Sequence, residues 1–251
     1  DAKKRFKSLF SEAVKLRLHA DVLVGTGLSG GMDSSSIACE INNLLMKDKK
    51  SGLQKTFSAC TTVDKYCEKN YIDETLAGYH KFFFIYLAEL LSKGNLKRFV
   101  QEARGLNRNH GYSYLTVIKK VLVYYRNTLR KLDKVDSWFL PKVRSSKVLP
   151  KNLKLIDESI SQMTMTSVPM QLHWCDRDSM AHSVESRAPF LDVNLVEFIL
   201  ACPSNYKISN GVSKYLLRES LKSLLPLRIY KRLGKIGFAT PEEEWVTKDQ
   251  Q

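Results

Sequence analysis

Cysteine is scarce in this sequence, and no pair of cysteines has the spacing of a redox motif or a metal site. The chain has five cysteines among 251 residues, and no two of them are separated by only two residues. Such an odd, scattered set predicts neither a disulfide framework nor a cysteine-based zinc site. Reduced thiols are the rule in the cytosol, so we expect a cytoplasmic protein.

Long apolar runs are also missing. The longest, residues 82–91, spans about ten residues and contains Glu89, so it is too short to cross a bilayer. The first residues carry no signal-peptide pattern, and no membrane association is expected. Apolar residues nevertheless make up 43% of the chain, which is ordinary for a globular protein with a substantial core.

Acidic residues are outnumbered by basic ones. The sequence has 26 Asp and Glu against 40 Lys and Arg, which gives a formal net charge of +14. This charge favours contact with polyanions such as nucleic acid or nucleotides. The basic runs at 3–7, 47–50 and 142–154 are, however, typical of solvated faces and loops. Nucleic acid is therefore not expected as a partner.

The strongest positive signal is the string Leu-Val-Gly-Thr-Gly-Leu-Ser-Gly-Gly-Met-Asp-Ser at residues 23–34. A short apolar run leads into a serine- and glycine-rich turn, and a mixed serine and apolar segment follows. We predict a strand over 21–28, a tight turn, and a helix over 34–46. Gly30 and Gly31 are expected to take positive φ and to let a ligand approach the backbone closely.

The chemistry of this turn predicts a nucleotide pyrophosphate with magnesium as the ligand. Ser29 and Ser34 supply hydroxyl groups, and the N-terminus of the following helix directs free N–H groups at an anion. Asp33 would repel a bare phosphate, but it fits a site in which Mg2+ lies between the carboxylate and the phosphates. No lysine follows the glycines as it does in a Walker loop. The alternative is a serine- and glycine-rich turn without a ligand.

Residues 29–34 resemble the pyrophosphate loop of the N-type ATP pyrophosphatases, which form AMP. Three later strings resemble elements of the glutamine-hydrolysing asparagine synthetase family, in that family's order. They are Asp-Arg-Asp-Ser-Met-Ala-His-Ser-Val-Glu-Ser-Arg-Ala-Pro-Phe-Leu-Asp at 176–192, Asp-Glu-Thr-Leu-Ala-Gly-Tyr at 73–79 and Lys-Ile-Gly-Phe-Ala-Thr-Pro at 235–241. The whole chain, 1–251, therefore resembles the C-terminal synthetase domain of this family.

The resemblance implies an α/β fold: a parallel sheet with flanking helices of the adenine nucleotide α-hydrolase-like type, followed by a largely helical second half. It also implies an ATP-dependent amide-forming ligase. In such an enzyme a carboxylate, here aspartate or an aspartate-like substrate, is adenylated with release of pyrophosphate. Ammonia or an amine then attacks the activated carbonyl, and AMP leaves. ATP and Mg2+ are the ligands that the resemblance implies.

The resemblance also assigns roles to particular residues. The residues that would bind ATP are Leu28, Ser29, Gly30, Gly31, Asp33 and Ser34. The metal ligands would be Asp33 and Asp73, the catalytic residues Lys235 and Glu185, and the residues that bind substrate or hold the site together Arg187 and Asp192. Ordinary structural roles stay open for four of these positions: core packing for Leu28, a helix cap for Asp73, a surface lysine for Lys235 and a salt bridge for Glu185 with Arg187.

Apolar spacing and turn residues predict the remaining elements. The expected helices are 2–18, 73–91, 96–105, 113–132, 191–200 and 213–224, the last capped by Ser213. A short strand is expected at 55–60, an exposed loop at 137–154 and an apolar face along 163–182.

The interval between the second expected strand and Asp73 is too short for this fold. A parallel crossover takes a dozen or more residues, and only the mostly polar residues 61–72 lie in this interval. The family carries several tens more residues here, with a Ser-Gly-x-Gly-type turn that this sequence lacks. We therefore expect that a segment of the protein is missing from this sequence near 71–73.

The family's glutaminase domain carries an N-terminal cysteine nucleophile, and no cysteine precedes the loop in this chain. We expect that domain to lie outside these residues, so that ammonia or an amine comes from it or from a partner chain. A homodimer is left open.

Two other functions also stay open. One is a tRNA-modifying adenylating enzyme of the same superfamily, which the charge of +14 favours and the string at 185–192 disfavours. The other is a non-catalytic nucleotide-binding or interaction protein.

Overall fold

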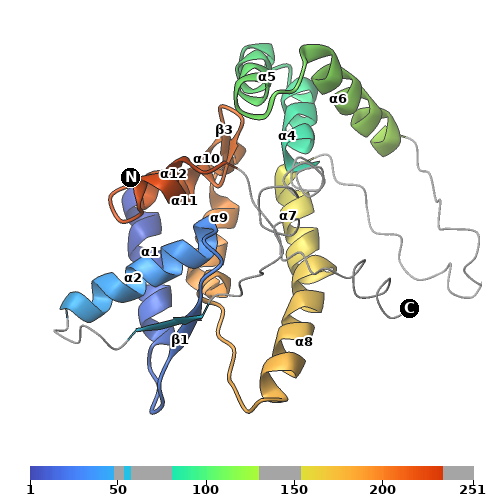
Figure 1. The fold of residues 1–251 in the computed structure, drawn as a ribbon. Helices are drawn as coiled ribbons and strands as arrows, with labels where there is room; N and C mark the ends of the chain where they lie inside the picture. Colours follow the sequence, from blue (N-terminus) through green and yellow to red (C-terminus); the bar gives the residue numbers. More distant parts are fainter. Residues whose placement is uncertain (48–53, 58–80, 130–153, 234–251) are drawn as a thin grey trace, which may run out of the picture. The chain divides into compact units, whose positions relative to one another are not determined.

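The computed structural model describes residues 1–47, 54–57, 81–129 and 154–233 (Figure 1). The chain divides into two compact units. The first comprises residues 1–80, 188–199 and 214–251, and the second comprises 81–187 and 200–213. Within the described ranges helices predominate, and the strands form one parallel and one antiparallel pair. None of the described helices is long and apolar enough to span a membrane.

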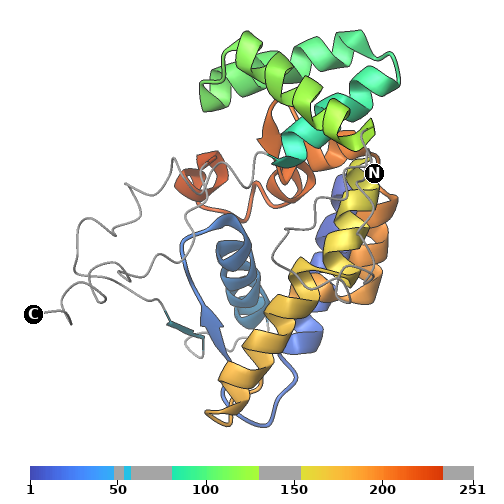
Figure 2. The ribbon, with the colours of Figure 1, turned by 90° about the vertical axis from the view of Figure 1, so that its right-hand side faces the viewer.

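The first unit contains the predicted strand, turn and helix. Its described elements are α1 (Ala2–Arg17), β1 (Gly25–Gly27), α2 (Met32–Lys47), β2 (Lys55–Phe57), η2 (Pro189–Leu191), most of α9 (Val193–Ala201), α11 (Tyr215–Ser220) and α12 (Leu227–Lys231). Strands β1 and β2 pair in parallel, with Thr26 opposite Thr56. Figure 2 shows α2 beside β1. The prediction of a parallel strand pair with a neighbouring helix is confirmed.

The first strand is much shorter than predicted. It covers three residues rather than the whole of 21–28, and Val22 and Leu23 lie outside it with exposed fractions of 78% and 71%. The ladder runs only where β2 supplies partners, and the described part of β2 is itself three residues long. The parallel sheet is thus confirmed in kind, and the adenine nucleotide α-hydrolase-like topology stays a prediction.

Helix α1 forms as its sequence predicts. The Asp1 side chain caps it by accepting a hydrogen bond of 3.1 Å from the backbone N–H of Lys3. Its buried positions follow the helical period; they are Phe6, Leu9, Phe10, Ala13 and Val14. The Phe10 ring also packs on Phe190 of η2, with 5.1 Å between centroids. This contact joins α1 to the Pro-Phe-Leu turn that precedes α9.

The second unit is largely helical, as predicted for the later part of the chain. Its described elements are α4 (Lys81–Ser92), α5 (Leu96–His110), α6 (Tyr114–Leu129), α7 (Leu155–Thr164), α8 (Ser167–Met180), α10 (Ser204–Lys207), β3 (Ile208–Ser209) and β4 (Val212–Ser213). Every residue from Phe83 to Leu90 is buried, so α4 is the central helix of this core. Figure 1 shows α7 and α8 following one another along nearly one line.

A buried carboxylate joins α4 to α7. Glu89 accepts hydrogen bonds from the backbone N–H of Leu155 at 3.0 Å and from Lys93 Nζ at 2.6 Å. Leu155 is the first residue of α7, and the preceding Lys154 makes no side-chain capping bond. Glu89 therefore satisfies one of the N–H groups that a helix N-terminus leaves open.

The stretch 163–182, for which an apolar face was expected, is divided between α7 and α8, and α8 contributes no buried side chain among the described residues. One sequence prediction is wrong in detail. The helix expected over 213–224 covers only Tyr215–Ser220. Ser213 lies in β4 instead of capping this helix, because Lys214 occupies the N-cap position. Residues 137–153 of the loop expected at 137–154, and the part of the expected helix before residue 81, lie outside the described residues.

Candidate functional site

The glycine turn between β1 and α2 has the predicted course. Gly30 has a φ of +68°, which is the left-handed region that glycine enters without steric cost. Gly31 does not lie in that region, so the prediction of positive φ is confirmed for Gly30 and wrong for Gly31. Helix α2 begins at Met32, two residues before the predicted start. Asp33 and Ser34 therefore belong to its first turn.

The hydroxyl groups of the turn lie together. Ser29 Oγ and Ser34 Oγ are 3.0 Å apart, and the Ser29 backbone N–H donates to Ser34 Oγ at 3.3 Å. Ser34 Oγ also donates to the Gly31 carbonyl at 3.4 Å. Leu28, at the start of the turn, is half-buried, and its backbone N–H donates to the Phe57 carbonyl of β2 at 2.7 Å. The structure thus brings all the predicted ATP-binding residues into one short turn at the N-terminus of α2.

A lysine far along the chain pairs with the acidic residue of this turn. The ammonium of Lys214 forms a salt bridge with the Asp33 carboxylate, and the two side chains are 33% and 41% exposed. Lys214 is the N-cap residue of α11, with φ 55° and ψ 33°. A residue with a Cβ adopts this left-handed conformation only at an energetic cost.

Two arginines complete the basic surroundings of the turn. Arg232 donates from Nη1 to the Gly30 carbonyl at 3.0 Å. Arg218 is only 6% exposed, and its guanidinium donates to the carbonyls of Tyr230 and Arg232, each at 2.7 Å. Burial lowers the pKa of Arg218, although the nearby Asp33 charge opposes this shift. Sequence reasoning missed these cations, because no local pattern distinguishes them among 40 lysines and arginines.

The predicted catalytic Glu185 belongs to the second unit. Arg187 donates to it from Nε and Nη2, both at 3.0 Å, so the pair is bidentate. This hydrogen bonding lowers the pKa of Glu185 and raises that of Arg187. The Glu185 side chain is 70% exposed. The predicted salt bridge is therefore present, and it leaves the carboxylate open to solvent.

Asp192, by contrast, is buried and fully engaged within the first unit. Arg17 Nη1 donates to its Oδ2 at 2.5 Å, and the N–H groups of Asn194 and Leu195 donate to its Oδ1 at 3.1 and 3.4 Å. The hydrogen bond from Arg17 is the main reason why the pKa of Asp192 is lowered, and burial opposes it. This carboxylate caps the N-terminus of α9 and ties that helix to α1.

Two predicted residues, Asp73 and Lys235, lie outside the described residues. Among the described residues no group of three or more His, Cys, Asp or Glu side chains could hold a metal ion. Asp33 alone still fits Mg2+, since that ion is commonly held by one or two carboxylates together with substrate phosphates. Its carboxylate is a hard oxygen donor in the same short turn as the hydroxyls of Ser29 and Ser34.

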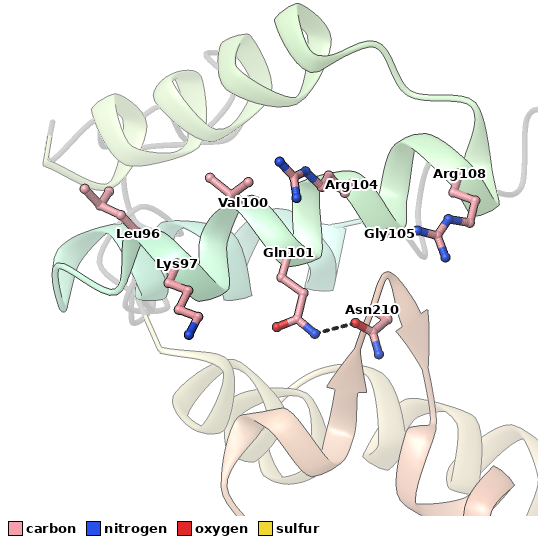
Figure 3. Close-up of a pocket in the computed structure, with 8 residues that line it drawn as sticks. All are labelled: Leu96, Lys97, Val100, Gln101, Arg104, Gly105, Arg108 and Asn210. Atoms are coloured by element: carbon pink, nitrogen blue, oxygen red, sulfur yellow. Dashed lines mark hydrogen bonds between the residues drawn. The ribbon is translucent and has the colours of Figure 1, made fainter.

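The second unit also contains a cavity. It has a volume of about 680 Å3 and is lined by Leu96, Lys97, Val100, Gln101, Arg104, Gly105, Arg108 and Asn210. Figure 3 shows Gln101 of α5 donating to Asn210 in the turn between β3 and β4, at 2.7 Å. Of the predicted site residues that the structure describes, none lines this cavity.

The first unit is an α/β structure in which a parallel strand, a glycine turn and a helix N-terminus gather two serine hydroxyls and a carboxylate. The family model for asparagine synthase matches this chain in two segments, residues 5–77 and 72–251. The chain therefore belongs to the asparagine synthase family.

Two of the relatives match at low identity over almost the whole chain. It is 24% identical to the glutamine-hydrolyzing asparagine synthetase of Gallus gallus over 98% of the chain, and 25% identical to that of Homo sapiens over 97%. Each match covers 45% of the relative, so the chain spans about half the length of these proteins. A shorter match, 35% identical over 30% of the chain and 12% of the relative, is to asparagine synthetase 1 of Bacillus subtilis.

Proposed function

We propose that this chain is the synthetase part of an ATP-dependent amide-forming ligase. It adenylates a carboxylate, aspartate or an aspartate-like substrate, and releases pyrophosphate. It then transfers ammonia or an amine to the activated carbonyl, which gives an asparagine-type product and AMP. The observation that carries the proposal is the turn at residues 29–34, which places hydroxyls and a carboxylate at the N-terminus of α2 in a chain of this family.

The turn supplies the groups that a pyrophosphate requires. Ser29 and Ser34 offer hydroxyl donors, and the open N–H groups of the first turn of α2 favour an anion. The left-handed Gly30 keeps a side chain away from the backbone that the phosphates would approach. Leu28, half-buried beside the turn, would contact the adenine.

Asp33, with Asp73 as its predicted partner, would hold Mg2+. When bound, the ion neutralises phosphate charge and favours departure of pyrophosphate. Lys235 would neutralise charge that develops on the α-phosphate or on the leaving pyrophosphate. The protein's contribution to such chemistry is mostly positioning and charge compensation, so no protein nucleophile is required.

Glu185 would interact with the incoming nitrogen nucleophile through its carboxylate. The lowered pKa keeps its carboxylate ionised at neutral pH and weakens it as a general base. Orienting an N–H donor is therefore the better use of this group, and Arg187 would fix the carboxylate in place. For Asp192, the Arg17 contact and the cap of α9 favour the alternative of holding the site together over direct contact with substrate.

The proposal extends to the parts of the protein beyond the described residues. The family match is itself divided at residues 72–77, which supports a missing segment near 71–73. The relatives are named as glutamine-hydrolyzing. We propose that ammonia reaches the site from a glutaminase domain or a partner chain.

Pyrophosphate release tests the proposal. The full-length protein is incubated with ATP, Mg2+, aspartate and ammonia, and pyrophosphate is measured for the wild type, Asp33→Ala and Asp21→Ala. Asp21 is exposed in the first unit and makes no ion pair among the described residues, so it controls for the loss of one negative charge. We expect release by the wild type and Asp21→Ala, and a loss of about 100-fold or more in Asp33→Ala. Unchanged release in Asp33→Ala, or no release with any amino-acid or peptide carboxylate, contradicts the proposal.

A further inference from the structure

The cavity along α5 in the second unit carries charge of one sign. Its charged lining residues are Lys97, Arg104 and Arg108, and no acidic side chain of the described residues lines it (Figure 3). All three are exposed, and none forms an ion pair or a side-chain hydrogen bond within the described part of the chain. Arg104 and Arg108 stand four residues apart, where like charges on a helix repel each other. The stability of α5 therefore does not explain this set of cations.

The sequence of α5 and α6 offers these cations no exposed acidic neighbour. Residues 96–129, which contain both helices, include seven lysines and arginines and a single acidic residue, Glu102. Glu102 is only 1% exposed. Its Oε2 accepts a hydrogen bond of 2.9 Å from the Gly211 N–H, and its Oε1 lies 3.3 Å from Arg98 Nε. Its charge is therefore used inside the unit, and the exposed cations favour an anionic ligand.

The hairpin of β3 and β4 forms part of the cavity wall. Asn210, in its turn, accepts a hydrogen bond of 2.7 Å from the Gln101 side chain, and its carbonyl accepts one of 2.9 Å from Asn109. Gly105 leaves room for this contact, since a Cβ there would lie 2.2 Å from the Asn210 carbonyl. The wall is thus fixed to α5 before a ligand binds, which lowers the entropic cost of binding. The volume of about 680 Å3 lies within the range of known ligand sites.

The other lining residues narrow the chemistry of the ligand. Leu96 and Val100 line the cavity and are 61% and 44% exposed, so the ligand needs apolar groups as well as negative charge. The row from Lys97 to Arg108 is about 16 Å long on a helix, which is more than one phosphate or a small dicarboxylate can bridge. No aromatic side chain of the described residues lines the cavity, so it lacks the platforms on which nucleic-acid bases stack. A peptide with both carboxylates and apolar side chains meets all of these conditions.

We propose that this cavity binds an acidic peptide segment of a partner protein. The carboxylates of the segment pair with Lys97, Arg104 and Arg108, and its apolar side chains cover Leu96 and Val100. Of the predicted site residues that the structure describes, none lines the cavity, so this binding is independent of the proposed ATP chemistry.

Fluorescence anisotropy measures the binding of a peptide probe to the full-length protein. The probe is a fluorescein-labelled synthetic peptide of about 15 residues, long enough to cover the row of cations as a helix. Its glutamates repeat the seven- and four-residue intervals between Lys97, Arg104 and Arg108, and leucines stand between them. A second peptide carries glutamine in place of every glutamate. Inorganic tripolyphosphate and a single-stranded RNA of similar length serve as competitors.

Two variants and one control are compared with the wild type. Arg104→Gln/Arg108→Gln removes two charges from the cavity, and Val100→Ser removes apolar surface without changing the charge. The control, Lys119→Gln/Arg126→Gln, also removes two charges. Its positions are exposed on α6, do not line the cavity and form no ion pair within the described ranges. Urea unfolding reports whether each variant is folded.

We expect the wild type to bind the glutamate peptide at least about tenfold more tightly than the glutamine peptide, with an affinity that falls as salt is added. Arg104→Gln/Arg108→Gln weakens this binding about tenfold, because two exposed charge pairs are lost. Val100→Ser weakens it about threefold through the loss of apolar contact. The control changes it by less than about twofold.

Three results would overturn the inference. The first is a folded wild type that does not bind the glutamate peptide or does not distinguish the two peptides. The second is a double variant, Arg104→Gln/Arg108→Gln, that binds the glutamate peptide as tightly as the control does. The third is displacement of the peptide by tripolyphosphate or RNA at lower concentrations than by unlabelled peptide, with no effect of Val100→Ser, which would assign the cavity to phosphates. Pyrophosphate release tests the proposed function separately, so either proposal can fail while the other stands.

Discussion

Replacement of Arg218 by Met tests whether one buried guanidinium fastens the segment that reaches the glycine turn. The substitution keeps most of the aliphatic stem and removes the two hydrogen bonds of 2.7 Å to the carbonyls of Tyr230 and Arg232. Arg232 is the residue that binds the Gly30 carbonyl. Loss of Arg218 should therefore loosen α12 and its contact with the turn.

The magnitude follows from the burial and the partners of this side chain. A hydrogen bond from a charged donor contributes about 1.5–3 kcal/mol, and two are lost. Part of this loss is offset, because burial of a guanidinium is costly and because water can reach the carbonyls of the half-buried Tyr230 and Arg232. We expect the free energy of unfolding to fall by about 2–3 kcal/mol.

Urea unfolding followed by circular dichroism measures this change, and Arg228→Met is the control. Arg228 lies on α12, is exposed, and makes no ion pair or side-chain hydrogen bond among the described residues. The control should stay within about 0.5 kcal/mol of the wild type, as surface substitutions usually do. If Arg218→Met is no less stable than Arg228→Met, the guanidinium does not fasten this segment and the reasoning is refuted.

Three further predictions concern the second unit, each checked by urea unfolding. Gly105→Ala should lower the free energy of unfolding by about 2–3 kcal/mol, because a Cβ there would lie 2.2 Å from the Asn210 carbonyl. A decrease of less than about 1 kcal/mol would show that the hairpin of β3 and β4 moves aside easily. Glu89→Ala should lower the free energy of unfolding by about 2 kcal/mol, because it leaves the Leu155 N–H without its acceptor. An unchanged free energy of unfolding would mean that water replaces the carboxylate. Burial lowers the pKa of His110 below its ordinary 6.5, so protonation of this side chain destabilises the folded protein. The stability that neutral His110 contributes is therefore complete above pH 6.5 and declines as the pH falls below that value. His110→Gln should flatten this part of the stability profile, and an unchanged slope contradicts the assignment.

Local patterns predicted the elements whose signals lie within a few residues. Helix α1 was predictable from its apolar period, and the turn at Gly30 from a glycine between a strand and a helix. Helix α5 shows the limit. Its predicted end at Gly105 is wrong, because the helix continues to His110 and is capped by Gly111 at φ 70°. Gly105 is required where the helix backbone meets Asn210 and Gly211, a contact that no local pattern reveals.

The candidate site also contains features that the local sequence predicts. Ser29, Asp33 and Ser34 are neighbours in sequence, so their meeting in one turn followed from local geometry. The bidentate pair of Glu185 and Arg187 was also predictable as one of two alternatives, because only one residue lies between these opposite charges in the sequence. The catalytic and binding roles of these residues stay predictions until the activity is measured.

The sequence by itself determined the family, the strand, turn and helix, and the carboxylate and hydroxyls that the turn presents, because all of these depend on neighbouring residues. Only the tertiary structure decided which cations contact that turn. Lys214 and Arg232 come from 181 and 202 positions beyond their partners in the turn. Contacts over such separations depend on how helices pack, and packing brings one lysine among many to Asp33 without leaving a periodic pattern in the sequence.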